Sequence, residues 1–191
     1  MTPFATVARL QVQRRALKPR PPGSGRYDPA PLVRVEALKV DKRGCVGLLG
    51  GERILDVHHA DHPASRNVRL VNSVSVLPRA HYDRMRARYG DHIVDGAAGE
   101  NVLLDTDGPL TADDLTGQLW IELDGQPAEV TGVLAAPPCV EFSRWVLGRE
   151  DLEVDDEVRA VLDDLDRGTR GFYLRPTGHG VLRPGARLWR A

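Results

Sequence analysis

Apolar and polar residues alternate near the start of the chain, over residues 8–13. A period of two places every second side chain on the same face, which is typical of a strand with one buried side. Further short runs, rich in β-branched residues and bounded by glycine, proline or asparagine, also predict strands. They cover residues 33–40, 53–57, 67–76, 117–123, 128–134, 172–175 and 186–189. So many short strands at close spacing predict a mainly β fold, either a barrel or a sandwich.

Two segments carry a helical period instead. In residues 78–89, Tyr82, Met85 and Tyr89 share one face, and Gly90 follows where a helix would end. The second segment covers residues 155–166, which present one apolar stripe. The acidic residues around this stripe are expected to form its solvated face. We expect both helices to cover openings of the barrel or to pack on its outside.

Length and composition describe an ordinary globular chain. The 191 residues are expected to form a single domain, with 41% hydrophobic and 28% charged residues and a net charge of −1. This balance argues against a disordered chain and against a broadly basic nucleic-acid binder. The apolar runs are far shorter than a membrane helix of about 20 residues, and the start lacks the apolar centre of a signal peptide. We expect a cytoplasmic protein with no membrane and no nucleic-acid partner.

The chain has two cysteines, Cys45 and Cys139, without a CxxC pair, so neither a disulfide framework nor a zinc ribbon is indicated. Cys139 follows Pro137 and Pro138, which halt a strand ladder, so its thiol is expected where a strand leaves the sheet. From the residues alone it is either a small buried apolar group or a reactive thiolate suited to transition metals and sulfur transfer. Cys45, in an expected turn, is left outside the site.

A glycine-containing run, GAAGENVLL, covers residues 96–104. Glycines permit positive φ and a close backbone approach, and exposed amides in such a loop can bind an anion. The run lacks the lysine of a P-loop and the GxGxxG pattern. A purely structural turn therefore remains an alternative.

Four segments in this order resemble the MOSC domain family, the sulfur-handling and molybdenum-cofactor-binding module. They are GAAGENVLL, DLTGQLWI, AEVTGVLAAPPC and RGFYLRPTGHGVLRPGARL. The resemblance implies a single MOSC domain over residues 1–191, with a core of about 40–191 and, in residues 1–30, a first strand and a Pro/Gly-rich loop. It further implies a MOSC-type β-barrel with two or three peripheral helices. Gln118 and Ala186 depart from the family pattern, at turn positions.

The resemblance also implies roles for individual residues. The cysteine of the family's "PC" element receives or presents sulfur, or binds the molybdenum of a pterin cofactor, and Cys139 stands at that position. Glu100 and Asn101 match the family's E-N pair and, with Gly99, are expected to shape the cofactor cleft. A phosphate on the cofactor would need cations, and by their places in the sequence Arg66, Arg69 and Lys18 are the best candidates, with a plain surface charge as the alternative for each.

His58, His59 and His62 stand close together and could form a metal cluster. However, Pro63 disfavours a continuing helix and no HExxH glutamate is present, so a structural role is the competing interpretation. His179 is expected to be structural or solvent-facing.

The leading functional prediction is molybdenum-pterin cofactor binding, sulfur carriage through Cys139, or both, with a sulfur donor or a molybdoenzyme as possible partners. Reduction of N-hydroxylated substrates is a related alternative, and it would require separate redox proteins because no FAD, NAD or iron–sulfur motif is visible. A non-catalytic barrel that binds a ligand or a partner protein is a third alternative. We expect no use of pyridoxal phosphate by this chain alone.

Overall fold

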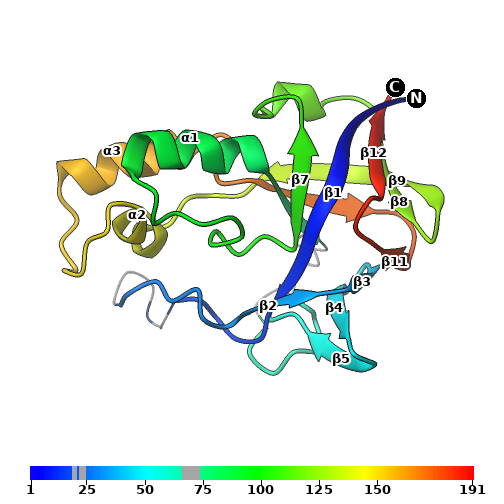
Figure 1. Cartoon of the computed structure of the whole chain (residues 1–191), viewed down its shortest axis with the longest axis horizontal. Coiled ribbons are helices and arrows are strands. Elements are labelled where there is room, and N and C mark those ends of the chain that lie inside the picture. The colour runs from blue at the N-terminus through cyan, green and yellow to red at the C-terminus, as the bar shows by residue number, and fades with distance from the viewer. Residues whose placement is uncertain (19–20, 22–24, 66–73) are drawn as a thin grey trace.

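The computed structural model describes residues 1–18, 21, 25–65 and 74–191 (Figure 1). Seven of the described strands form a closed barrel in the order β12-β8-β9-β10-β6-β7-β1, and pairing of β1 with β12 completes the ring. Their bounds are β1 (Thr2–Gln13), β6 (Val74–Pro78), β7 (Val102–Thr106), β8 (Leu119–Leu123), β9 (Gln126–Ala135), β10 (Phe172–Pro176) and β12 (Arg187–Arg190). The predicted mainly β barrel is confirmed.

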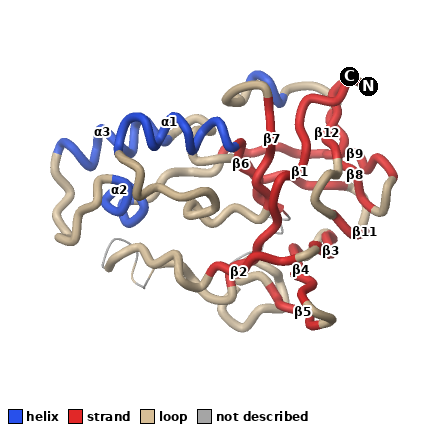
Figure 2. The backbone as a smooth tube through the Cα atoms, in the orientation of Figure 1, coloured by secondary structure: helices blue, strands red, loops and turns tan. Residues whose placement is uncertain are grey.

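A smaller sheet adjoins the barrel, with the order β11-β3-β4-β5 (Figure 2). Its strands are β3 (Ala37–Asp41), β4 (Gly44–Leu49), β5 (Glu52–Leu55) and β11 (Gly180–Leu182). The predicted strand over residues 33–40 is divided at Glu36, because β2 (Leu32–Val35) pairs with β1 while β3 joins the smaller sheet. Of the predicted strand over residues 67–76, the part up to residue 73 lies outside the described residues.

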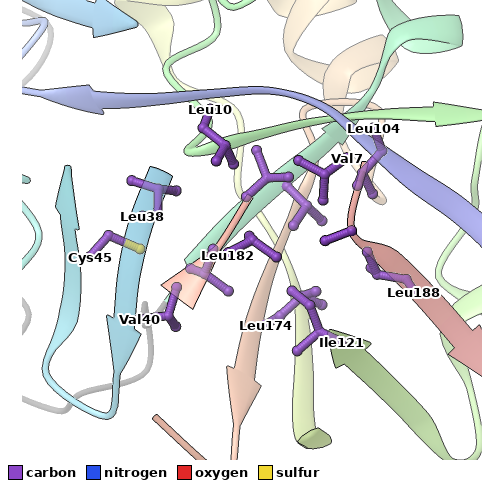
Figure 3. Packing of buried hydrophobic residues seen from close by; sticks show 14 of the residues in the cluster. Val7, Leu10, Leu38, Val40, Cys45, Leu104, Ile121, Leu174, Leu182 and Leu188 are labelled. Carbon is purple, nitrogen blue, oxygen red and sulfur yellow. The ribbon is translucent and has the colours of Figure 1, made fainter. Parts of the chain in front are cut away.

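The barrel interior is filled by the apolar side chains that alternate along its strands (Figure 3). Leu10, Leu104 and Ile121 come from three different strands and are fully buried. Leu38 and Leu182 extend the same cluster into the smaller sheet. Burial of this apolar surface is the main force that stabilises the barrel.

Three α-helices lie together on one side of the barrel, and both termini lie on the other (Figure 1). The predicted helix over residues 78–89 is α1 (Arg79–Tyr89), with Gly90 at its end. The predicted helix over residues 155–166 is α3 (Asp156–Leu165), and the Asp155 side chain caps it by accepting a hydrogen bond from the Val158 amide.

A further helix, α2 (Val140–Val146), was not predicted. It is too short to show a helical period in the sequence. Phe142 and Val146 of α2 pack with Tyr82, Met85 and Leu165 in a second apolar cluster. No helix among the described residues is long and apolar enough to cross a membrane.

Candidate functional site

A cavity of about 300 Å³ lies beside this second apolar cluster. Its walls come from segments far apart in the sequence: the loop that follows β1, the turn before β7, the segment after β9 and the first residues of β10. We call it the Cys139 cavity, and the residues that matter for its chemistry are Lys18, Tyr27, Gly99, Glu100, Cys139 and Arg170. The structure thus brings together three of the predicted site residues, Gly99, Glu100 and Cys139.

Cys139 stands at the junction between β9 and α2. The strand ends at Ala135, two prolines follow, and Cys139 occupies the residue before the helix with an extended backbone. Its side chain is half-buried, lines the cavity and is in no disulfide. The structure therefore places the thiol where the strand leaves the sheet, as the double proline predicts.

The turn over residues 96–101 packs tightly against β1. Gly99 has a φ of 84°, and a Cβ there would meet Leu17 Cδ1 at 2.6 Å and Gln13 Nε2 at 2.8 Å. Two of the amides in this turn have partners within the protein, since Ala98 N donates to the Tyr82 hydroxyl at 2.8 Å and Gly99 N donates to Gly96 O at 2.9 Å. The glycine here permits close packing on β1.

Glu100 is the buried carboxyl of the cavity, with 3% of its surface exposed. Its Oε2 accepts a hydrogen bond from Tyr82 Oη at 2.7 Å, whereas Oε1 has no partner among the described residues. Burial raises the pKa of Glu100 to about 7, against smaller lowering effects of the Tyr82 hydrogen bond and the Arg170 charge. The carboxyl can therefore gain or lose a proton near neutral pH.

Asn101 lies behind the wall of the cavity and is almost completely buried. Its Oδ1 accepts hydrogen bonds from Ser75 N at 3.1 Å and from Ser75 Oγ at 2.9 Å. Its Nδ2 donates to Asp56 Oδ2 at 3.0 Å. These bonds tie the turn to β6 and to the segment after β5, so the contacts of Asn101 in this structure are architectural.

The predicted cations divide into two groups. Arg66 and Arg69 lie outside the described residues. Lys18 lines the cavity, with its Nζ 3.9 Å from Glu141 Oε2. The expectation that Arg66 or Arg69 meets a phosphate therefore stays a prediction.

Sequence reasoning missed two residues of the cavity wall, Tyr27 and Arg170. Tyr27 comes from the Pro/Gly-rich loop; its hydroxyl donates to Ala97 O at 2.7 Å, and its ring meets that of Phe142 edge-on at 5.0 Å. The Arg170 guanidinium lies 4.2 Å from the centre of the Phe142 ring. A signal for Arg170 was present in the flanking glycines, Gly168 and Gly171, which mark a tightly packed turn.

The histidines after β5 make hydrogen bonds within their own segment and to the chain beside it. His58 Nδ1 is 3.0 Å from Asp56 Oδ1, and His59 Nδ1 accepts from the Asp61 amide at 3.1 Å. His62 Nε2 is 3.1 Å from Arg14 O. These hydrogen bonds favour the structural interpretation of the three histidines. Among the described residues, no group of three or more His, Cys, Asp or Glu side chains could hold a metal ion.

The comparisons with known proteins agree with this architecture. The MOSC domain model matches residues 57–189. The YuaD protein from Bacillus subtilis is similar in structure, with a TM-score of 0.58 over 97% of this chain and 94% of that chain at 12% identity. YiiM from Escherichia coli gives a TM-score of 0.52 over 98% of this chain and 68% of that chain at 14% identity. At these identities the structural likeness shows the fold alone. No curated protein matches the chain.

Proposed function

The chain belongs to the MOSC domain family, which is linked to molybdenum cofactor binding, and from this membership we propose that it binds a molybdenum-pterin cofactor in the Cys139 cavity. The proposal rests on one observation: the half-buried Cys139 thiol opens on a cavity that also holds a buried carboxyl and a guanidinium. Small-molecule sites are typically concave, partly apolar and equipped with a few convergent polar groups.

The residues present fit such a cofactor. A thiolate is a soft donor that suits a transition metal, so Cys139 would hold the molybdenum. The Glu100 Oε1 atom, which has no partner among the described residues, is a buried polar group left for a ligand. The cofactor would supply the redox chemistry, while the protein supplies binding, orientation and electrostatics.

Glu100 would exchange protons at the site. Its pKa of about 7 allows either protonation state at neutral pH, and Tyr82 fixes the carboxyl by donating to Oε2. Electrons would come from separate redox proteins, as expected from the missing flavin, nicotinamide and iron–sulfur motifs. Reduction of N-hydroxylated substrates is one reaction class compatible with these parts.

The position of the thiol favours metal ligation over sulfur carriage. A sulfur carrier has to present its persulfide to the active sites of other proteins, whereas Cys139 is half-buried in the wall of a cavity. A small molecule enters such a cavity more readily than a partner protein does. We therefore place sulfur carriage second.

Molybdenum content tests the proposal. The protein, expressed in cells that make the cofactor, should contain close to one molybdenum per chain by elemental analysis, and Cys139→Ser should reduce this to near zero. Cys45→Ala is the matched control, because Cys45 is the other thiol of the chain and does not line the cavity. This variant should retain the metal. Equal molybdenum in the wild type and Cys139→Ser, or none in either, would overturn the proposal.

The same samples distinguish the alternatives. After incubation with a persulfide donor, a sulfur carrier without metal would gain the mass of one sulfur atom at Cys139 in intact-protein mass spectrometry. A non-catalytic barrel would show neither metal nor added sulfur, and its cellular phenotype would be unchanged by Cys139→Ala.

A further inference from the structure

Arg170 is held in the wall of the Cys139 cavity by a turn that leaves it little freedom. The turn joins α3 to β10, and its Gly168 and Gly171 have φ angles of 101° and 102°. A Cβ on Gly171 would meet Val76 O at 2.6 Å, and one on Gly168 would meet the Phe172 ring at 2.3 Å. The backbone on both sides of Arg170 is therefore pressed against the barrel, and only glycine permits this approach.

The guanidinium itself is positioned by an aromatic ring. It lies 4.2 Å from the centre of the Phe142 ring in α2. Stacking on a ring face uses the flat face of the guanidinium and leaves its N–H edge for hydrogen bonds. One of these hydrogen bonds goes to the Tyr27 side chain, and a guanidinium has five N–H donors in all. Arg170 thus combines a fixed position with donors on the edge of a planar group.

No carboxylate of the described residues forms an ion pair with Arg170. Other polar groups around the cavity have partners: Lys18 lies near Glu141, and the His58 ring lies against Asp56. Glu100 bonds to Tyr82, and burial raises its pKa, so its negative charge is incomplete at neutral pH. The Arg170 charge lowers the pKa of Glu100, so the two groups interact, but the described residues give Arg170 no ion-pair partner within 4.0 Å.

We propose that Arg170 forms an anion-binding subsite of the Cys139 cavity, which takes a tetrahedral oxyanion such as the phosphate group of a bound molecule. Its planar fork of donors matches the geometry of an oxyanion, and half-burial strengthens the charge-assisted hydrogen bonds. This inference rests on the proposed function, because it takes the Cys139 cavity to be the place where the ligand binds. It adds a cationic contact that neither the sequence motifs nor the family match assigned.

Sulfate is a suitable probe because it is a tetrahedral dianion whose charge is constant across the neutral pH range. Isothermal titration of sulfate into the full chain, at constant ionic strength maintained with chloride, should detect binding to the wild type. Arg170→Gln should weaken it roughly tenfold or more, the effect expected for losing charge-assisted hydrogen bonds. Arg170→Lys keeps the positive charge but loses the planar set of N–H donors, so it should bind sulfate with an intermediate affinity.

Arg167→Gln is the matched control. Arg167 belongs to the same turn, is exposed and does not line the cavity, so its substitution should leave sulfate affinity unchanged. Near-ultraviolet circular dichroism of each variant checks that α2 still packs on the barrel. Sulfate binding that is absent in the wild type, or equal in the wild type and Arg170→Gln, would overturn the inference. If Arg170→Gln unfolds, the same comparison is made with Arg170→Lys.

Two sources of the natural anion can be separated with molybdenum-loaded protein. If the anion is the cofactor's phosphate, loaded wild type should no longer bind sulfate and Arg170→Gln should lose molybdenum. If it belongs to a separate substrate, loaded wild type should still bind sulfate and Arg170→Gln should keep molybdenum. Both results support the subsite and assign its ligand.

Failure of the inference can be told from failure of the proposed function, because sulfate affinity and molybdenum content are measured independently. A chain that holds molybdenum through Cys139 but shows no effect of Arg170→Gln on sulfate loses only the inference. A chain that never acquires molybdenum but binds sulfate through Arg170 loses only the proposed function.

Discussion

The two cysteines lie in different environments within one fold. Cys45, on β4, is 2% exposed and packs into the barrel core near Leu38 and Val40 (Figure 3). Burial raises the pKa of the Cys45 thiol well above its ordinary value, and the charges of Asp56 and Asp41 add to this. Cys139 is half-buried and faces a cavity. The same side chain is thus a small core residue in one region and an accessible sulfur in the other.

The local sequence explains the difference. Cys45 belongs to β4, which pairs with β3 on one side and with β5 on the other. Its side chain points to the face of this sheet that packs into the core. Cys139 follows two prolines that end the pairing of β9 and direct the chain toward α2. Residues 44–47 of β4 are all buried, whereas the end of β9 leaves Cys139 half-buried beside the cavity.

Alkylation of the native protein tests this comparison most strongly. Iodoacetamide should modify Cys139 at least about a thousandfold faster than Cys45, because exposing a core thiol requires an opening that costs several kcal/mol. Peptide mass spectrometry over a time course measures both rates in one sample. In denaturant the two rates should converge, and similar native rates would contradict the assignment of Cys45 to the core.

Much of the fold followed from periodicity. The alternating run over residues 8–13 and the short β-branched runs predicted most strands, and the helical stripes located α1 and α3. β4 was missed because Gly44 and Gly47 interrupt its pattern. Gly47 serves packing, since a Cβ there would meet Val35 Cγ1 at 2.8 Å, and no local rule reveals a contact with another strand.

The site was less predictable than the fold. The position of Cys139 followed from the prolines before it, and Glu100 from the family resemblance. Arg170 and Tyr27 lie in loops without periodicity, and they reach the cavity through contacts between distant segments. Local sequence rules describe neighbours along the chain, so they could not show that these side chains meet Cys139.

The buried carboxyl of the cavity predicts a pH effect on stability. Because burial raises the pKa of Glu100 from 4.5 to about 7, the folded protein holds a proton that the unfolded chain releases. The contribution of Glu100 to the free energy of unfolding is therefore fully present below pH 4.5 and is lost as the pH rises through about 7. The loss should be on the order of 3 kcal/mol, since each pKa unit corresponds to about 1.4 kcal/mol.

Glu100→Gln should remove this dependence from urea unfolding curves measured between pH 5 and 8. Asp155→Asn is the control, because hydrogen bonds from the Val158 amide and Arg149 lower the pKa of Asp155 and neither partner titrates in this range. Asp155 is thus ionised throughout this range, and its substitution should leave the slope unchanged. A wild-type slope that persists in Glu100→Gln would contradict the assignment of the raised pKa to this carboxyl.

Cysteine-to-serine substitutions at the two thiols should change the free energy of unfolding by the smallest amounts. Cys45→Ser puts a hydroxyl into the core and should lower the free energy of unfolding by about 1–3 kcal/mol, the cost of burying such a group without full compensation. Cys139→Ser leaves the hydroxyl at a polar cavity, so its cost should stay below about 0.5 kcal/mol. Urea denaturation of the metal-free protein measures both, so that loss of a ligand does not add to the effect. Equal costs at the two positions would mean that Cys139 is packed as tightly as a core residue, and the cavity would then be closed to ligands in solution.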